Sequence, residues 1–268
     1  VMALLLAVSQ FHIAYSQEAR MYTLLLLVFS LSFLFFLRER YVIAATFGGL
    51  CLWVHAYSAV SYVTLWVVQR KDSLKSMLAY ILFALPLIPF LVTMYSGKTA
   101  GTPGWGWPGY HLVVEGFRQM LGYGFWIPAL MAVLMILGCC YLWGNDRRRL
   151  MQLVVFIAAV SMVSMLVSFL MPMTPRYLIT LMPAFLLLAA LGIRESDKAG
   201  PVLLVILLVM SGVSLHGYYT TMVKDDWRPV VPVVQDAPVA VVGPEFSGAY
   251  QDVVMYHALP LQYYCQGC

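Results

Sequence analysis

The sequence predicts an all-α membrane protein that crosses the bilayer many times. Of its 268 residues, 62% are hydrophobic and only 10% are charged, and the mean hydropathy is +0.83. A soluble domain has about a quarter of its residues charged. The apolar residues also gather in long runs that stop at short clusters of Lys and Arg, as membrane helices do. A net charge of +4, scattered along the chain, does not indicate a nucleic-acid partner.

The membrane domain is predicted to cover residues 1–217 with about nine transmembrane segments. Residues 1–14 predict the end of a first helix, and because Val1 lies inside that apolar run, we expect further chain upstream of it. Residues 21–37 predict the second segment, since 17 apolar residues are at the lower limit of length for a helix that crosses roughly 30 Å of hydrocarbon.

The run 41–69 predicts a hairpin of two helices rather than one tilted helix. Clusters of Lys and Arg flank the run on both sides, at residues 38–40 and 70–75. Short loops rich in these residues stay in the cytoplasm. Both ends of the run therefore face the same side, and His55 and Tyr57 are expected near its outer tip.

Five further segments complete the predicted domain. Residues 77–94 predict a span kinked at Pro86 and Pro89, because proline interrupts helical hydrogen bonding. The last four crossings are predicted at residues 125–143, 150–171, 177–193 and 201–217.

A polar loop, residues 95–124, separates the fifth and sixth segments. Within it, His111, Glu115 and Arg118 follow one another at i, i+4 and i+7, the spacing of one helix face. We interpret this run as a helix in the membrane interface with a solvated polar face; a ligand role for His111 and Glu115 is the alternative.

This topology divides the 16 Lys and Arg residues unequally between the two sides. Ten fall in cytoplasmic loops, mostly in clusters. The other six, expected outside, are Arg20, Lys98, Arg118, Arg176, Lys224 and Arg228. Arg20, Arg176 and Arg228 stand alone beside aromatic residues. An anionic ligand on the outer face explains such solitary arginines, since guanidinium binds phosphate oxygens through a planar fork.

The stretch 9–22 concentrates polar side chains between two apolar runs. Glu18 and Arg20 are then either at a membrane boundary or in a protein cavity, where ionisable groups are functional candidates. The alternative is an ion pair that closes a turn between two membrane helices.

Three short motifs in this order resemble a known family. They are residues 15–22 (Tyr-Ser-Gln-Glu-Ala-Arg-Met-Tyr), residues 175–178 (Pro-Arg-Tyr-Leu) with the apolar run after them, and residues 226–228 (Asp-Trp-Arg). Together they are similar to motifs of the polyprenyl-phosphate-dependent glycosyltransferases of the GT-C superfamily. Within it, the protein O-mannosyltransferases and lipid A aminoarabinose transferases of glycosyltransferase family 39 type resemble the chain most.

The resemblance implies a multi-pass enzyme of the cell membrane with its active face outside the cytoplasm. It would move a sugar from a polyprenyl-phosphate donor to a protein, lipid or glycan acceptor, with membrane lipids around it. The donor lipid is the only cofactor implied, no metal ligands are assigned, and a divalent ion is left open. The family's acidic general base precedes anything in this chain, so we expect residues 1–268 alone to be inactive. A lipid-linked substrate transporter, or flippase, and a non-catalytic membrane subunit are the alternatives.

The candidate site residues follow from the chemistry of a phosphate leaving group. Arg20 and Arg176 are expected to clamp the phosphate, and Glu18 to orient Arg20. The remaining candidates donate hydrogen bonds, stack on the donor or support the site: Tyr15, Tyr22, Tyr177, His12 and His55. A purely structural role for either histidine is the alternative.

Residues 218–268 are predicted to form a small extracytoplasmic α/β segment, with a strand at 239–242 and a helix at 249–258. At about 50 residues it is short of a self-sufficient domain, so we expect more chain after it. Cys265 and Cys268 form a C-x-x-C that is either a disulfide or half of a metal site. The other three cysteines lie in apolar runs as small hydrophobic residues.

Overall fold

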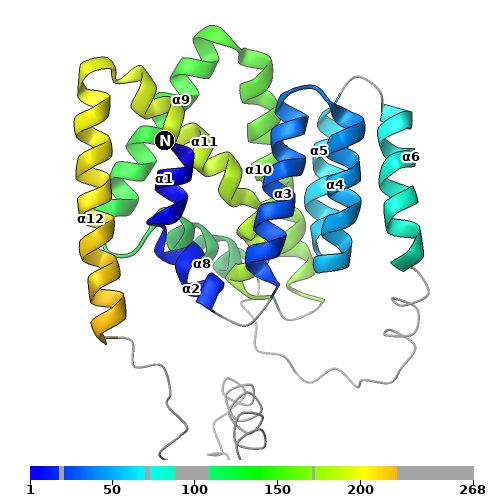
Figure 1. Ribbon diagram of the computed structural model, residues 1–268, viewed down its shortest axis with the longest axis horizontal. Coiled ribbons are helices and arrows are strands. Elements are labelled where there is room, and N and C mark those ends of the chain that lie inside the picture. The colour runs from blue at the N-terminus through cyan, green and yellow to red at the C-terminus, as the bar shows by residue number, and fades with distance from the viewer. Residues whose placement is uncertain (18–20, 70–72, 88–108, 171–172, 222–268) are drawn as a thin grey trace, which may run out of the picture.

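The computed structural model describes residues 1–17, 21–69, 73–87, 109–170 and 173–221, and every regular element in these ranges is a helix (Figure 1). Four helical stretches within them are long and apolar enough to cross a membrane: Trp126–Asn145, Arg147–Val167, Pro175–Glu195 and Asp197–Thr220. The prediction of an all-helical membrane domain is confirmed for the described residues as far as helix type, length and composition show it. The predicted α/β tail, with Cys265 and Cys268, lies outside the described residues.

The expectation of nine full-length spans is not met in the described residues. Four further apolar helices occur where spans were predicted, but each is short: α3 (Tyr22–Leu37), α4 (Tyr41–Val54), α5 (Ser58–Val68), and α6 (Ser73–Ala84) with the 3-10 turn η1 (Leu85–Leu87). The 16 residues of α3 reach only about 24 Å, less than the roughly 30 Å of hydrocarbon.

The first predicted helix is two helices, which corrects the prediction for residues 1–14. Helix α1 (Met2–Ala7) ends before Ser9, and α2 (Gln10–Gln17) begins after it. The side-chain oxygen of Ser9 accepts a hydrogen bond from the backbone N–H of His12 (3.4 Å), which is the bond of an N-terminal cap. Ser9 therefore starts a new helix inside an otherwise apolar run.

The predicted hairpin is present, because His55–Tyr57 separate α4 from α5. The predicted kink at Pro86 is instead a helix end. Helix α6 stops at Ala84, and Pro86 lies in the 3-10 turn that follows. Proline has no N–H for the helical bond, so the regular helix does not continue through it.

The second half of the chain contains the longest helices. In order they are α8 (Tyr110–Leu121), α9 (Trp126–Asn145), α10 (Arg147–Val167), the 3-10 segment η2 (Pro175–Leu181), α11 (Met182–Glu195), the turn η3 (Asp197–Ala199) and α12 (Gly200–Thr221). Pro183, in the first turn of α11, cannot donate to the carbonyl of Ile179 near the end of η2. The N–H of Met182 donates to that carbonyl in its place.

Helix α11 is the centre of the structure, with α9, α1, α3 and α12 beside it, and α12 lies at the edge (Figure 1). In the most apolar 18-residue stretch of Pro175–Glu195, 72% of the residues are buried. The corresponding values for α9, α10 and the α12 span are 22%, 28% and 17%. Only the central helix is enclosed by protein, and the other three leave most of their apolar surface free for lipid.

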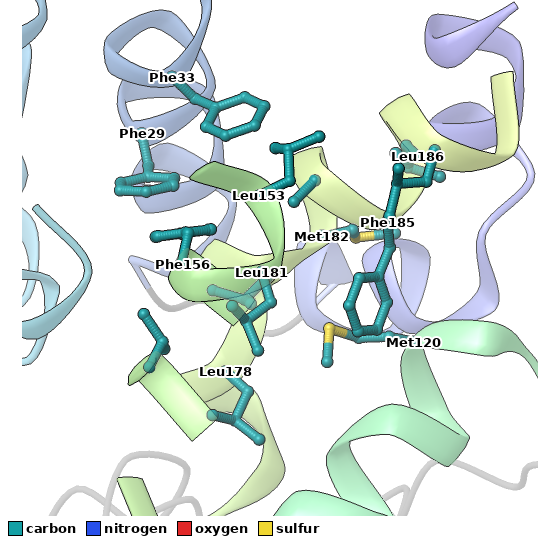
Figure 2. Close-up of a cluster of buried hydrophobic side chains, with 14 of the residues drawn as sticks. Phe29, Phe33, Met120, Leu153, Phe156, Leu178, Leu181, Met182, Phe185 and Leu186 are labelled. Atoms are coloured by element: carbon teal, nitrogen blue, oxygen red, sulfur yellow. The ribbon is translucent and has the colours of Figure 1, made fainter. Parts of the chain in front are cut away.

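The large apolar side chains that surround α11 come from four other elements (Figure 2). Phe29 and Phe33 of α3 each contact Phe156 of α10, with ring centroids 6.0 Å apart. On the other side, Phe117 of α8 meets Phe185 of α11 edge to face at 5.0 Å. These rings join α3 to α10 and α8 to the central helix.

Helices α9 and α11 approach backbone to backbone at two glycines. A Cβ on Gly138 would overlap the carbonyl group of Leu188, and a Cβ on Gly192 would overlap that of Leu134. The two contacts are reciprocal and four residues apart on each helix, as in an antiparallel pair. Small residues at such contacts are the usual way for membrane helices to pack closely.

Replacing Gly138 with alanine is therefore expected to destabilise the protein by about 1–3 kcal/mol, because the added carbon meets rigid backbone. Gly144→Ala is the matched control in the same helix, since nothing lies within 4 Å of a Cβ there. Thermal unfolding in detergent should show a lower midpoint for Gly138→Ala and an equal or higher midpoint for Gly144→Ala. Equal midpoints for the two variants would contradict the close contact.

Candidate functional site

The helices have two chemically different ends. Arg38 and Arg40 lie between α3 and α4, and Arg147–Arg149 open α10, so arginines gather at one end. Arg149 binds the carbonyl oxygen of Leu37 (3.5 Å), which places the two groups together. The other end carries aromatic residues. Ser164 follows Arg147 by 17 positions along α10, which separates the two ends by about 26 Å.

Five rings meet at the second end, and we call them the tyrosine cluster: Tyr15, Tyr22, His55, Tyr57 and Tyr177. Ring centroids of Tyr22 lie 5.8 Å from Tyr15, 5.7 Å from His55 and 6.4 Å from Tyr177. His55 and Tyr57 lie 5.1 Å and 5.8 Å from Tyr177. The cluster joins α2, the start of α3, the α4–α5 turn and η2.

Arg176 brings a positive charge to this cluster. Its guanidinium carbon lies 5.5 Å from the centroid of the Tyr22 ring, within cation–π distance. Pro175 begins η2, and the 3-10 turn presents Arg176 and Tyr177 in succession before the central helix starts. The 15–22 motif and the 175–178 motif, far apart in sequence, therefore meet at the contact between Tyr22, Arg176 and Tyr177.

His55 is neutral in this environment, and its proton position follows from its hydrogen bond. The backbone N–H of Tyr57 donates to Nδ1 of His55 (3.2 Å), so Nδ1 carries no proton and Nε2 carries it. Burial lowers the pKa of His55, and the charge of Arg176 lowers this pKa further. His55 thus offers a neutral N–H donor within the tyrosine cluster.

Tyr57 is held by a directed chain of hydrogen bonds to α10. The hydroxyl of Ser164 donates to the carbonyl of Val160 (2.5 Å), so the Tyr57 hydroxyl is the donor in its own 2.5 Å bond to Ser164. Burial raises the pKa of Tyr57 to about 12. The phenol therefore keeps its proton and fixes the α4–α5 turn against α10.

A second polar network reaches the cluster from α8. The Tyr15 hydroxyl donates to Oε1 of Gln119 (3.4 Å), and Gln119 donates to Glu115 (2.8 Å). Arg118 binds the Glu115 carboxylate through two nitrogens at 2.7 and 2.6 Å. Hydrogen bonds from Arg118 hold the pKa of Glu115 below its ordinary value. The predicted polar face of this helix is thus a network that holds Tyr15, while His111 remains exposed.

Of the eight site residues predicted from the sequence, the structure gathers five: Tyr15, Tyr22, His55, Arg176 and Tyr177. Glu18 and Arg20 lie outside the described residues. His12 lies in α2, one turn before Tyr15. Its Nδ1 is buried and has no hydrogen-bond partner among the described residues, and no ring of the tyrosine cluster contacts it.

Tyr57, Ser164 and Gln119 were not among the predicted site residues. The sequence predicts Tyr57 at the hairpin tip, and its nearness to His55 is the available signal for a place in the site. Ser164 and Gln119 are neutral residues on helices whose sequence gives no sign of the tertiary contact. Among the described residues, no three His, Cys, Asp or Glu side chains are grouped closely enough to hold a metal ion.

Comparison of the chain with family models, curated proteins and solved structures finds no match in any of the three.

The bond from Tyr57 to Ser164 predicts that two serine-to-alanine substitutions in α10 have different effects on stability. Ser164→Ala should cost about 1–3 kcal/mol, because it leaves the half-buried Tyr57 hydroxyl without its acceptor. Ser161→Ala, one turn away, removes a buried hydroxyl that has no hydrogen-bond partner among the described residues and should be neutral. Thermal unfolding of both variants in detergent checks this difference, and equal losses would refute the directed bond.

The lowered pKa of His55 makes stability depend on pH. Above about pH 7 the histidine is neutral in both folded and unfolded chains and contributes nothing. Below the ordinary value of 6.5 the unfolded chain takes up a proton that the folded chain resists, so stability falls as pH decreases until the folded-state pKa is passed. The melting temperature of His55→Phe should therefore fall less between about pH 7.5 and pH 5.5 than that of the wild type. His111→Phe, at an exposed position, is the control and should follow the wild type.

Proposed function

We propose that this protein is a membrane glycosyltransferase that takes its sugar from a polyprenyl-phosphate donor. The observation that carries the proposal is the contact between the two motifs on which the family resemblance rests. Tyr22 and Tyr177 are 155 residues apart in sequence, yet their ring centroids lie 6.4 Å apart, with Arg176 over the Tyr22 ring. Motifs that form one site are expected to meet in this way, whereas unrelated matches have no reason to.

The chemistry of the cluster suits a phosphate leaving group. As the bond between sugar and phosphate breaks, negative charge develops on the phosphate oxygens, and groups that bind that charge lower the barrier. Arg176 offers a planar cation for this role, and Nε2–H of His55 offers a neutral donor. The partly exposed rings of Tyr15, Tyr57 and Tyr177 offer aromatic surface on which a sugar can stack. Arg20 and Glu18 belong to this proposal as second cation and its orienting carboxylate.

The topology that goes with this function places the tyrosine cluster outside and the arginine end in the cytoplasm. Clustered arginines favour the cytoplasmic side, which supports the assignment. The short helices α3–α6 would then also pass through the bilayer, where local thinning accommodates spans below full length. A multi-pass protein of the cell membrane with an extracytoplasmic active face follows, as does an acceptor that is reached from that side.

A transporter of a lipid-linked substrate is less well supported. Substrate sites in such proteins lie near the bilayer midplane, where helices are interrupted. Here the cluster lies where elements begin and end: Tyr22 opens α3, His55 follows the last residue of α4, and Arg176 lies in the first turn of η2. A site at the helix ends is reached from one face of the membrane, as transfer to an external acceptor requires.

The test is transfer by the full-length protein from a set of polyprenyl-phosphate sugars, with Arg176→Lys as the main variant. Lysine keeps the charge and loses the fork, so turnover should fall by about 30- to 150-fold, equivalent to about 2 to 3 kcal/mol. Arg20→Lys should behave in the same way. Arg148→Lys, at the opposite end of the helices, should leave turnover unchanged.

Equal turnover in all three variants would remove the phosphate-binding role. Movement of the lipid-linked sugar across vesicles without transfer would favour the transporter. Thermal midpoints measured beside the assays separate lost chemistry from lost folding.

A further inference from the structure

A second polar feature lies at the arginine end, where a groove of about 580 Å³ runs between α5 and α10. Helix α10 lines it with Arg147, Arg148, Met151, Gln152 and Val155, and α5 lines it with Val67 and Val68. We call this the arginine groove. Its volume is that of a typical small-molecule site. It is separate from the tyrosine cluster, which lies at the other end of α10.

The groove changes from charged to apolar along its length. Arg147, Met151 and Val155 are four residues apart and share one face of α10, so Met151 and Val155 lie about 6 and 12 Å beyond Arg147 along the axis. Met151, Val155 and Val67 are 50%, 42% and 65% exposed. The walls therefore pass from a guanidinium mouth to an uncovered apolar floor within two turns of a helix long enough to span the membrane.

The arginines at the mouth are not all neutralised by the protein. Arg149 binds Asp146 at 3.3 Å, and Arg148 lies 3.6 Å from Glu39 with 42% of its side chain exposed. Arg147 packs over the ring of Trp143 at 4.1 Å, and no carboxylate among the described residues forms an ion pair with it. Residues 38–40 and 146–149 together carry five arginines against two carboxylates. The mouth is left with positive charge.

We propose that the arginine groove binds one anionic phospholipid of the cytoplasmic leaflet, with its phosphodiester at Arg147 and Arg148 and the first part of an acyl chain along Met151, Val155 and Val67. Charge complementarity selects the head, since basic pockets between membrane helices attract anionic lipids. The apolar floor favours an acyl chain as the part of the ligand that follows the head. A peptide in the same place would bring unpaired backbone groups into hydrocarbon, which an acyl chain does not.

Gln152 shapes this groove rather than binding the lipid. Its side-chain amide donates to the carbonyl of Val68 (3.2 Å) at the end of α5. This bond satisfies one of the carbonyls left open at a helix C-terminus and holds α5 and α10 at the distance that leaves the groove between them.

The test is lipid binding by the full-length protein in detergent, titrated with phosphatidylglycerol or phosphatidylcholine and followed by native mass spectrometry. We expect one phosphatidylglycerol to be retained in preference to phosphatidylcholine. Each arginine near the membrane surface contributes about 1 kcal/mol, so Arg147→Gln and Arg148→Gln should each weaken retention about fivefold. Arg194→Gln, which removes an exposed cytoplasmic-side charge on α11 away from the groove, is the control for general electrostatic attraction.

A second variant tests the apolar part of the site without a change in charge. Val155→Phe fills the floor at a position that is already 42% exposed, so it should fold normally and still lose phosphatidylglycerol. Glycerol phosphate at the same concentration should not compete, because it has the anionic head and no chain.

Four results would overturn the proposal. They are equal retention of the two lipids, equal retention by the Arg147→Gln variant and the wild type, undiminished binding by Val155→Phe, and full competition by glycerol phosphate. The readout is independent of sugar transfer, so the lipid site stands or falls separately from the proposed glycosyltransferase activity.

Discussion

The backbone contact between α9 and α11 determines where the candidate site lies. In lipid there is no hydrophobic force to drive helices together, so close packing of small residues and interhelical hydrogen bonds must do it. Gly138 and Gly192 let the two backbones touch, and this fixes the axis of α11 inside the bundle. The segment η2 continues directly into α11. The packing of the central helix α11 therefore sets the positions of Arg176 and Tyr177.

The elements that bring the other cluster residues are tied to this centre by polar contacts. The hydroxyls of Ser61 in α5 and Thr180 in η2 lie 2.6 Å apart in the core, and Tyr57 binds Ser164 on α10. Tyr15 is held from α8 through Gln119. A buried hydroxyl without a partner is costly, so each bond favours a single relative position of two helices. The tyrosine cluster is thus held in place through separate hydrogen bonds that involve α5, η2, α8 and α10.

Much of this arrangement could be predicted from the sequence, and the failures have physical causes. The break at His55–Tyr57 was predictable because charge clusters on both sides require a return to the same face. The break at Ser9 was missed because one serine in an apolar run signals a helix cap only once its bond to His12 is known. The count of nine spans came from the number of apolar runs, and it fails because several of those runs, such as α3, form helices shorter than the hydrocarbon is thick. The pairing of the two motifs was expected from family resemblance, whereas Ser164 and Gln119 join the site only through tertiary contacts.

Arginine side chains at the two ends of the helices differ in how strongly they attract an anion, because their surroundings differ. At the mouth of the arginine groove the arginines are half exposed and close to one another, so water and salt weaken the attraction of each one for an anion. Arg176 stands among aromatic rings and beside a neutral histidine, where the local dielectric is lower and a single charge acts more strongly. Attraction between a guanidinium and a phosphate grows as that dielectric falls, and so does the cost of taking the phosphate out of water. An arginine in such surroundings therefore needs hydrogen-bond donors close by to bind a phosphate, and Nε2–H of His55 supplies such a donor within the cluster.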